Sequence, residues 1–416
     1  MSDIRFFLGA EGAATLSDVL DRSAALPAWA PFDQRAVAFV GRFAQRLLTD
    51  PQARQFPELV ALAHWFRAGR LKELASEYPN ETAAAIVRGR GLAFHLAPAN
   101  VDSVFMYSWL LSLLAGNVNI VRVSQKPSLQ LDFLIGVLSR VLLEEVGSAV
   151  AGRFVLLTYP HDDSITEAIS ARCMARVIWG GDATVAAIRA IPLRPTAVEL
   201  CFPDRFSVAA ISAKHILALG AEQLASVASR FYNDAFWFAQ QACSSPRLVN
   251  WVGLPADVES ARRRFWAAVD AEVRLKTPEN TGAMGMARLT ASFEYAAAEI
   301  ARPDHGADTE RFPTLLQLER PLSAIAKELH CGNGLFLEQH FEQLADLAAQ
   351  LTDKEQTLAH IGFTRAEVVA LVDALPPRAL DRVVPIGEAL AFALVWDGTD
   401  LITFFTRKIT LHGVLA

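Results

Sequence analysis

The hydrophobic pattern of the chain changes near Gly89. In residues 32–48 apolar side chains such as Val37, Val40 and Phe43 recur every three or four residues, the period of a helix with one buried face. We therefore expect the first 85 or so residues to be helical. From Gly89 onward short apolar runs alternate with helical patterns, an order that is typical of parallel strands joined by crossover helices.

The pattern after Gly89 predicts a doubly wound α/β domain. The expected strands cover residues 92–96, 118–123, 154–159, 177–179 and 197–202. Helices are expected between them, near residues 103–115, 126–146, 165–171 and 183–191. Gly116 is placed to end the first of these helices, because glycine readily adopts the conformation found after a helix C-terminus.

A second α/β domain is expected beyond Asp204. Its pattern predicts strands at residues 207–211 and 247–252, helices at 222–231 and 233–238, and helices filling much of 258–273 and 337–351. Residues 391–396 and 401–406 look like strands around an Asp397-Gly398 turn. The expected domains are residues 1–203, residues 204–375 and a terminal stretch, 376–416, that returns to the first domain or to a subunit interface.

Composition narrows the classes of protein that this chain can represent. Its 416 residues suffice for two or three domains, and 52% hydrophobic against 20% charged residues excludes a mainly disordered chain. Lys and Arg total 39 against 45 Asp and Glu, which gives a net charge of −6. Because no basic stripe compensates this balance, we expect no nucleic-acid partner.

One apolar run raises the question of a membrane span. Residues 103–121 form 19 uncharged positions, close to the length that crosses a bilayer. Gly116-Asn117 interrupts the run and Asn119 follows, so we expect a buried helix, a turn and a buried strand. The first twelve residues lack the basic flank and apolar run of a secretory signal. We expect no membrane span and a cytoplasmic location.

Cys243 is the most interesting of four scattered cysteines, which are too few for a disulfide scaffold or a zinc site. It lies in a polar stretch between the small residues Ala242 and Ser244, whereas Cys201 is enclosed by apolar neighbours. A nucleophile needs an open approach and a backbone N–H that faces the developing oxyanion. On context alone, Cys243 is either such a nucleophile or a structural cysteine.

Three further features have two interpretations each. Asn100 follows a predicted strand, so its amide either stabilises an oxyanion or caps the next helix. His95, on an apolar strand, is more typical of a core residue than of a proton carrier, and His360 is expected in a loop at a helix end. The aromatic residues within 231–238 either line an acyl tunnel or, as is usual at helical spacing, pack in the core.

Several short motifs resemble the aldehyde dehydrogenase superfamily. In chain order they are Pro98-Ala99-Asn100, Leu114-Ala115-Gly116-Asn117 running into Val121-Arg122, Glu199, and Gln241-Ala242-Cys243. Three segments resemble one family within this superfamily, the acyl-CoA reductases, which are the LuxC-type long-chain fatty-acid reductases. These segments are residues 240–246, residues 381–387 and Trp396-Asp397-Gly398. The resemblance covers residues 88–252 well and 376–410 fairly.

The resemblance implies a role for each matching position. Cys243 is the thiol that accepts the acyl group, and Asn100 is the amide that stabilises the oxyanion together with the cysteine N–H. Arg122 takes the place of a lysine that contacts the adenosine ribose or its phosphate. Ser124 and Lys126 lie beside it and could assist a 2′-phosphate; Lys126 is otherwise a solvated helix start.

The cofactor pyrophosphate is expected at a glycine turn. Gly180 and Gly181 match this turn and allow close backbone approach, with Asp182 expected as the N-cap of the following helix. Glu199 matches a glutamate that activates water in hydrolytic aldehyde dehydrogenases. The glycines and lysine that usually follow it are replaced by Cys201-Phe202-Pro203. Glu199 therefore either assists deprotonation of Cys243 or has no catalytic task.

The implied activity is reduction of an acyl thioester to an aldehyde by NADPH or NADH, through an acyl-cysteine intermediate and without a metal. The acyl donor is acyl-CoA or an acylated partner synthetase, and the superfamily implies a homo-oligomer. Three alternatives stay open. They are aldehyde oxidation with Glu199 activating water, a cofactor-free cysteine acyltransferase or thioesterase, and a non-catalytic relative that binds a partner.

Overall fold

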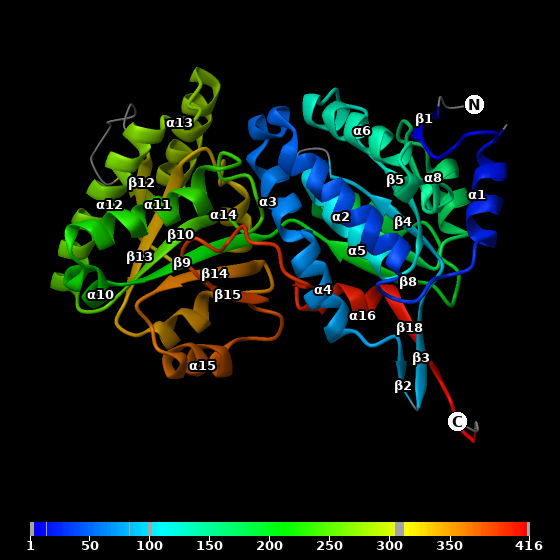
Figure 1. The fold of residues 1–416 in the computed structure, drawn as a ribbon. Coiled ribbons are helices and arrows are strands. Elements are labelled where there is room, and N and C mark those ends of the chain that lie inside the picture. The colour runs from blue at the N-terminus through cyan, green and yellow to red at the C-terminus, as the bar shows by residue number, and fades with distance from the viewer. Residues whose placement is uncertain (1–3, 14, 83, 99–101, 304–311, 414–416) are drawn as a thin grey trace. The chain divides into compact units, whose positions relative to one another are not determined.

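The chain forms two compact units. The computed structural model describes residues 4–13, 15–82, 84–98, 102–303 and 312–413 (Figure 1). The first unit comprises Met1–Pro203 and Phe392–Ala416, and the second comprises Asp204–Ala391. The chain thus enters the second unit once and returns to the first for its last segment.

The first unit is built on a six-stranded sheet with the order β1-β6-β5-β4-β7-β8. All neighbours are parallel except the pair of β1 with β6. The strands are β1 (Arg5–Leu8), β4 (Leu92–Leu96), β5 (Val118–Arg122), β6 (Phe154–Thr158), β7 (Ala175–Trp179) and β8 (Val198–Phe202). From β4 onward the chain builds outward to β5 and β6 and then crosses over to β7 and β8, so the predicted doubly wound sheet is confirmed.

The run at residues 103–121 is a helix, a turn and a strand, as the sequence predicted. Helix α5 (Asp102–Leu114) is followed by Gly116 with a φ of 94° and then by β5. A Cβ atom on Gly116 would lie 2.3 Å from the Trp29 carbonyl oxygen, so only glycine fits this turn. Within the part of the chain that the structure describes, no helix has the length and apolar composition needed to cross a bilayer.

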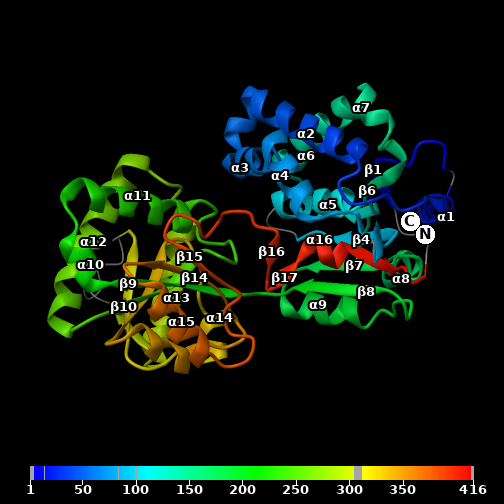
Figure 2. The ribbon, with the colours of Figure 1, turned by 60° about the horizontal axis from the view of Figure 1, so that its bottom comes forward.

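Helices cover both faces of this sheet. In Figure 2, α5 and α2 (Gln34–Thr49) are stacked on one face, whereas α9 (Asp182–Arg189) lies on the other. Further helices of this unit are α1 (Leu16–Ala25), α3 (Pro57–Trp65), α4 (Ala68–Glu77), α6 (Leu129–Leu142), α7 (Glu145–Ser148) and α8 (Asp163–Ser170). The helical start and the helix expected at residues 32–48 are confirmed.

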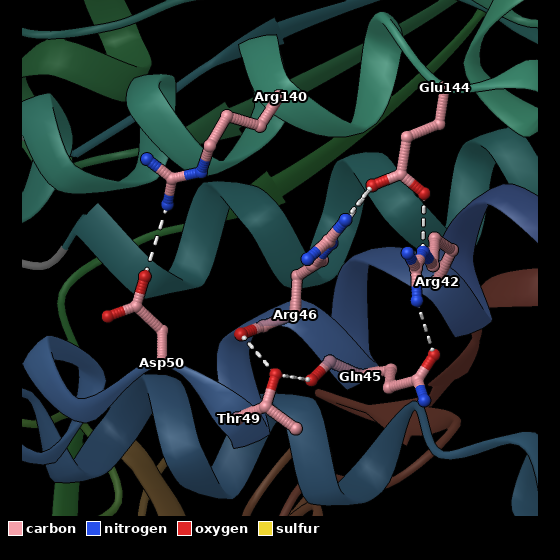
Figure 3. A network of polar contacts seen from close by, with 7 residues as sticks. All are labelled: Arg42, Gln45, Arg46, Thr49, Asp50, Arg140 and Glu144. Carbon is pink, nitrogen blue, oxygen red and sulfur yellow. Dashed lines mark hydrogen bonds and ion pairs between the residues drawn. The ribbon is translucent and has the colours of Figure 1, made fainter.

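A network of ion pairs joins α2 to the end of α6. Figure 3 shows Glu144, just after α6, reaching Arg42 Nε at 2.5 Å and Arg46 Nη2 at 2.6 Å. Asp50 and Arg140 form a second ion pair at 3.1 Å. These side chains are accessible to water, so the network orients two helices without a buried charge.

The second unit holds a seven-stranded sheet with the order β11-β12-β13-β10-β9-β14-β15, parallel except for β11. Its strands are β9 (Phe206–Ser212), β10 (Pro246–Val252), β11 (Ala301–Pro303), β12 (Thr314–Leu318), β13 (Leu335–Phe341), β14 (Glu355–Ile361) and β15 (Arg382–Pro385). Its helices are α10 (Ala213–Ala218), α11 (Ala221–Phe236), α12 (Pro255–Lys276), α13 (Gly282–Ala297), α14 (Ala324–Glu328) and α15 (Arg365–Ala374).

Two predictions for this unit are wrong. Residues 337–351 are not a helix, because Leu335–Phe341 is strand β13 and Leu344–Gln350 is a 3-10 turn. The two helices expected at 222–231 and 233–238 are a single helix, α11. Parallel pairing of β13 with β10 and β12 overrides the local helical spacing, and a carboxylate buried on β13 is neutralised by other elements.

That carboxylate belongs to Glu338, which is fully buried. Its Oε1 accepts hydrogen bonds from Trp251 Nε1 at 2.8 Å and Trp266 Nε1 at 2.7 Å. Its Oε2 accepts from Arg262 Nε at 2.9 Å and Nη2 at 2.5 Å. Four donors from β10 and α12 thus satisfy one charge on β13 and connect the sheet to its covering helix.

The last segment, Phe392–Ala416, forms part of the first unit, whereas residues 376–391 belong to the second. Strands β16 (Val395–Trp396) and β17 (Thr399–Asp400) pair around Asp397-Gly398, so the predicted turn is confirmed. The strand expected at 401–406 is wrong: Leu401–Phe405 is helix α16, whose first turn is capped by Asp400. Strand β18 (Thr406–Thr410) then pairs antiparallel with β3 (Ala85–Gly89), which also pairs with β2 (Glu81–Thr82).

Replacement of Glu338 tests the buried network. We expect Glu338→Gln to lower the free energy of unfolding by about 3–5 kcal/mol, because it removes the buried negative charge to which Trp251, Trp266 and Arg262 donate. Urea unfolding of the full chain measures this loss. The control is Glu144→Gln, whose partners Arg42 and Arg46 remain hydrated and whose loss should be much smaller. Equal losses in both variants would contradict this account.

Candidate active site

Cys243 lies in a turn between α11 and β10. Its carbonyl accepts a hydrogen bond from Ser207 Oγ at 2.6 Å, and Ser245 N donates to the Ala242 carbonyl at 3.1 Å. Ser245 Oγ donates to the Asp234 carbonyl at 2.7 Å. Ser244 and Ser245 are buried, whereas Cys243 keeps part of its surface exposed. The turn is therefore fixed by its neighbours, while the cysteine retains the approach that a nucleophile requires.

Two glutamines connect this turn to the loop before β13. Gln240 Nε2 donates to the Pro246 carbonyl at 2.9 Å, and its Oε1 accepts from Gly334 N at 3.0 Å. Gln241 Nε2 donates to the Cys331 carbonyl at 2.8 Å. A Cβ atom on Gly332, whose φ is 67°, would lie 2.5 Å from that Gln241 nitrogen. The close approach of the two loops therefore requires glycine at this position.

The backbone just before the turn is strained. Ala239 and Gln240 have φ angles of 48° and 63°, in the left-handed region that residues with a Cβ atom seldom adopt. The Ala239 carbonyl accepts from Asn333 N at 2.7 Å, so the neighbouring loop stabilises the conformation. Such strain at a fixed cysteine turn is a feature of functional sites.

Asp234 joins the turn to the segment that follows β15. Its carboxylate accepts hydrogen bonds from Gly387 N at 2.6 Å and Ala389 N at 3.0 Å, while its carbonyl accepts from Ser245. Burial raises the pKa of Asp234 to about 7, although the two backbone N–H groups oppose this shift. One residue of α11 thus fixes both the cysteine turn and the 387–389 segment.

Sequence reasoning did not identify Ser207, Asp234 or Gln240. Gln240 stands inside the motif of residues 240–246, and its position beside Gln241 is a local signal for a hydrogen-bonded loop. Ser207 and Asp234 carry no such signal, because the Cys243 carbonyl lies 36 residues from Ser207 and the Gly387 N–H lies 153 residues from Asp234 in the chain.

The other three cysteines are poor nucleophiles. Burial raises the pKa of Cys173 to about 12 and, together with the nearby charge of Glu199, that of Cys201 to about 11. Burial also raises the pKa of Cys331. Because the thiolate is the reactive form, these surroundings disfavour all three.

In the first unit, the carboxyl ends of the strands carry the predicted cofactor residues. The strand order reverses between β4 and β7, and ligands of open α/β sheets bind at such a switch point. Gly180 and Gly181 follow β7 directly, at the start of α9. Gly181 is the N-cap, so the expectation that Asp182 caps this helix is wrong. A Cβ atom on Gly181 would meet nothing within 4 Å. An open N-terminus without a side-chain cap fits a pyrophosphate.

Arg122 is the last residue of β5, with Ser124 and Lys126 in the loop that follows. Its Nη2 donates to the Tyr159 carbonyl at 3.1 Å and its guanidinium lies 5.0 Å from the Tyr159 ring centroid. Its buried Nε has no hydrogen-bond partner among the described residues. Lys126 is exposed, and its backbone N–H donates to Ser124 Oγ at 3.1 Å. This loop therefore presents cations at the same sheet edge as the glycine turn.

Glu199 lies on β8 with both carboxylate oxygens engaged. It forms an ion pair with Arg176, which is opposite on β7 and almost fully buried, and accepts from Arg189 Nε at 3.2 Å. A carboxylate that neutralises a buried arginine is poorly placed to accept a proton from water. The arrangement favours the interpretation in which Glu199 has no catalytic task.

Asn100 lies outside the described residues. His95, on β4, is a buried core residue as predicted: Ser108 Oγ lies 2.8 Å from Nδ1 and Asn119 Oδ1 lies 3.0 Å from Nε2. Burial lowers its pKa to about 4, so the ring is neutral. The expectation that His360 lies in a loop is wrong, because it belongs to β14.

The aromatic residues of α11 are core residues. Phe231, Tyr232 and Phe236 are buried, and Phe231 contacts the rings of Phe265 and Phe336 at centroid distances of 5.1 and 5.5 Å. For these three residues the packing favours the core interpretation over an acyl tunnel. Trp237 and Phe238, which follow α11, are half-buried.

The fold defines the class of protein. Indole-3-acetaldehyde dehydrogenase AldA of P. syringae is similar with a TM-score of 0.71 at 13% identity, over 99% of this chain and 96% of that chain. Aldehyde dehydrogenase KauB of Pseudomonas aeruginosa is similar with a TM-score of 0.70 at 12% identity, over 99% and 96%. The chain therefore has the fold of the aldehyde dehydrogenases, which confirms the predicted fold class.

The sequence also matches one particular protein family. The family model for acyl-CoA reductase (LuxC) matches residues 50–276, more than half of the 416-residue chain. The chain belongs to this family, an assignment that supports an enzyme acting on acyl groups and confirms the resemblance read from the motifs. No curated protein matches the sequence.

The pKa of Asp234 predicts a pH-dependent stability. Because the folded value of about 7 lies above the ordinary 3.8, the unfolded chain releases this proton first. The associated stabilisation is complete below about pH 4 and is lost as the pH rises toward 7. Urea unfolding of Asp234→Asn, which cannot titrate, should show a flatter dependence on pH over this range. Parallel curves for the variant and the unmodified protein would contradict the assignment.

Proposed function

We propose that this protein reduces an acyl thioester to an aldehyde, with NADPH or NADH as the electron donor and Cys243 as the acyl acceptor. The observation that carries the proposal is the Cys243 turn, in which a partly exposed cysteine is fixed by buried hydrogen bonds in a chain of the acyl-CoA reductase family. The three remaining cysteines have raised pKa values and are disfavoured as acceptors.

In the proposed first step, the Cys243 thiolate attacks the carbonyl carbon of the acyl thioester. A carbon–sulfur bond to Cys243 forms, the bond to the CoA sulfur breaks, and CoA leaves as its thiolate. As the family resemblance implies, the Asn100 amide and the Cys243 N–H stabilise the intermediate oxyanion. Donors of this kind act on charge that develops in the transition state, and each is worth several kcal/mol.

The second step needs a nicotinamide cofactor, which when bound supplies hydride to the carbonyl carbon of the acyl-enzyme. We assign its pyrophosphate to Gly180 and Gly181, and its adenosine end to Arg122, Ser124 and Lys126. The solved AldA structure contains NAD⁺, which supports a nicotinamide cofactor in this fold. The resulting thiohemiacetal oxyanion on Cys243 collapses: the carbon–sulfur bond breaks, the aldehyde leaves and the thiolate is regenerated.

The geometry weighs against the hydrolytic alternative. Oxidation of an aldehyde to an acid needs a base that activates water. The candidate base is Glu199, but its carboxylate is engaged in ion pairs with Arg176 and Arg189. Assays in both directions, with and without CoA, separate the two reactions. Calorimetric titration with NADPH and NADH separates a reductase from a cofactor-free acyltransferase. We further propose that the donor is acyl-CoA or an acylated partner synthetase and that the chain forms a homo-oligomer.

Covalent labelling tests the acyl acceptor. We expect Cys243→Ala to abolish incorporation of radioactivity from an acyl-CoA labelled in its acyl group, because no other cysteine is suitably activated. The control is Cys201→Ala, which should retain labelling. Peptide mapping of the labelled protein identifies the residue. Persistent labelling of the Cys243→Ala protein would overturn the assignment.

Turnover tests the oxyanion donor. We expect Asn100→Ala to reduce kcat by ~10²–10³ without unfolding the chain, as is typical when one oxyanion donor is removed. Loss of reduced-cofactor absorbance measures turnover, and thermal unfolding checks the fold. An unchanged kcat would show that Asn100 only caps a helix. The same assay, repeated over acyl-CoA chain lengths, identifies the preferred substrate.

A further inference from the structure

The second unit contains a buried arginine without an acidic partner. Arg288 lies on α13 and is 4% exposed. Among the residues that the structure describes it forms no ion pair, and its buried Nε has no hydrogen-bond partner. Its guanidinium instead contacts a backbone carbonyl and the face of an aromatic ring. A buried charge without a counter-ion is costly, so these two contacts must explain why an arginine lies here.

The first contact leads to the strained backbone before Cys243. Arg288 Nη1 donates to the Asn333 carbonyl at 2.9 Å, and Asn333 N donates to the Ala239 carbonyl at 2.7 Å. Asn333 and Ala239 both have left-handed backbone conformations, with φ angles of 58° and 48°. Such conformations persist only where the surrounding structure enforces them. The guanidinium therefore fixes the residue that in turn holds Ala239, four positions before the cysteine.

The second contact leads to the same turn by a separate route. The Arg288 guanidinium lies 4.8 Å from the Phe312 ring centroid, within the range of a cation–π interaction. Phe312 packs against Gly334 so closely that a Cβ atom on this glycine would lie 2.4 Å from the ring. Gly334 N donates to Gln240 Oε1 at 3.0 Å. The arginine thus supports two neighbouring residues of the loop before β13, and each of them is hydrogen-bonded to the segment that precedes Cys243.

We propose that Arg288 is a positioning residue for the acyl-transfer step: through the loop before β13, it holds the Cys243 turn in the conformation from which the thiol attacks. This inference rests on the proposed function, because it assumes that Cys243 accepts the acyl group. A guanidinium suits the role because its planar group can stack on a ring while its N–H groups donate to a carbonyl. An apolar side chain would fill the same space without fixing the loop.

Hydrogen exchange of the full chain, followed by peptide mass spectrometry, tests the connection without substrate or cofactor. Two amides of the turn are hydrogen-bonded, since Gln241 N donates to the Phe238 carbonyl and Ser245 N to the Ala242 carbonyl. We expect Arg288→Met to raise the exchange rate of peptides that cover these amides by roughly tenfold, the effect of losing one supporting hydrogen bond. Arg288→Lys keeps a donor and should restore most of the protection.

The matched control is Arg264→Met, in the same unit. Arg264 donates to three carbonyls at the end of α10. Its replacement should raise exchange around α10 and leave the Cys243 turn protected. Unchanged exchange of the turn in Arg288→Met, or an equal rise in Arg264→Met, would overturn the proposal.

Single-turnover acylation without cofactor measures the consequence for the reaction, because release of the CoA thiol reports the attack by Cys243. We expect Arg288→Met to lower the rate constant at saturating acyl-CoA by about 10–10²-fold, since misplacement by about 1 Å can cost 10²-fold. The half-saturating concentration should stay unchanged, because the substrate still binds. Arg264→Met should retain the full rate constant. A variant at Arg288 that affects only the half-saturating concentration would contradict a positioning role.

A second variant keeps the proposal testable if Arg288→Met does not fold. Phe312→Leu removes the ring that Arg288 covers and that packs against Gly334, so it should also raise exchange of the turn. Unchanged exchange in this variant would overturn the proposal. Acylation of the unmodified protein reports separately on the proposed function. If Cys243 is not acylated while exchange of its turn depends on Arg288, the reductase mechanism is refuted and the connection between Arg288 and the turn stands.

Discussion

Parallel strand pairing is the constraint on which both units depend. A buried parallel ladder satisfies its backbone only within the sheet, so neighbouring strands begin and end at common edges where polar loops gather. In the second unit β13, β10 and β9 are neighbours, and their amino ends bring together Gly334, the Cys243 turn and Ser207. In the first unit the carboxyl ends of β5 and β7 carry Arg122 and Gly180. Parallel pairing thus brings together two different groups of candidate functional residues, one in each unit.

Buried polar groups give this scaffold its specific shape. Glu338 is neutralised by donors from two other elements, and Asp234 accepts two backbone N–H groups from the segment after β15. Each group is stable only when all its partners are present, because an unsatisfied buried charge costs several kcal/mol. The cysteine turn is hydrogen-bonded to one of these groups, Asp234, through Ser245, and this contact helps to fix the turn. Glu199 follows the same logic in the first unit, where its charge serves the buried Arg176.

Local patterns predicted the elements whose stability is local. Largely apolar runs such as Leu92–Leu96 became buried strands, and Gly116 ended its helix where expected. The pattern failed where distant partners decide. Residues 337–351 have helical apolar spacing, yet Glu338 is accepted in a buried strand because two tryptophans and an arginine from elsewhere reach it. Residues 401–406 have strand-like side chains, but the cap supplied by Asp400 starts a helix there.

The sequence by itself determined the two α/β units, the family and the choice of Cys243 as the candidate nucleophile. These depend on hydrophobic periodicity and short motifs, which are properties of residues that are neighbours in the chain. Only the tertiary structure decided which polar groups meet. Ser207 lies 36 residues from Cys243 and Gly387 lies 153 from Asp234, yet each pair forms a hydrogen bond. The shift in register between β10 and β9, between Pro246 and Leu248, likewise exists only once the two strands pair. Chain order does not encode these contacts locally, because they arise when separate strands pack into one sheet.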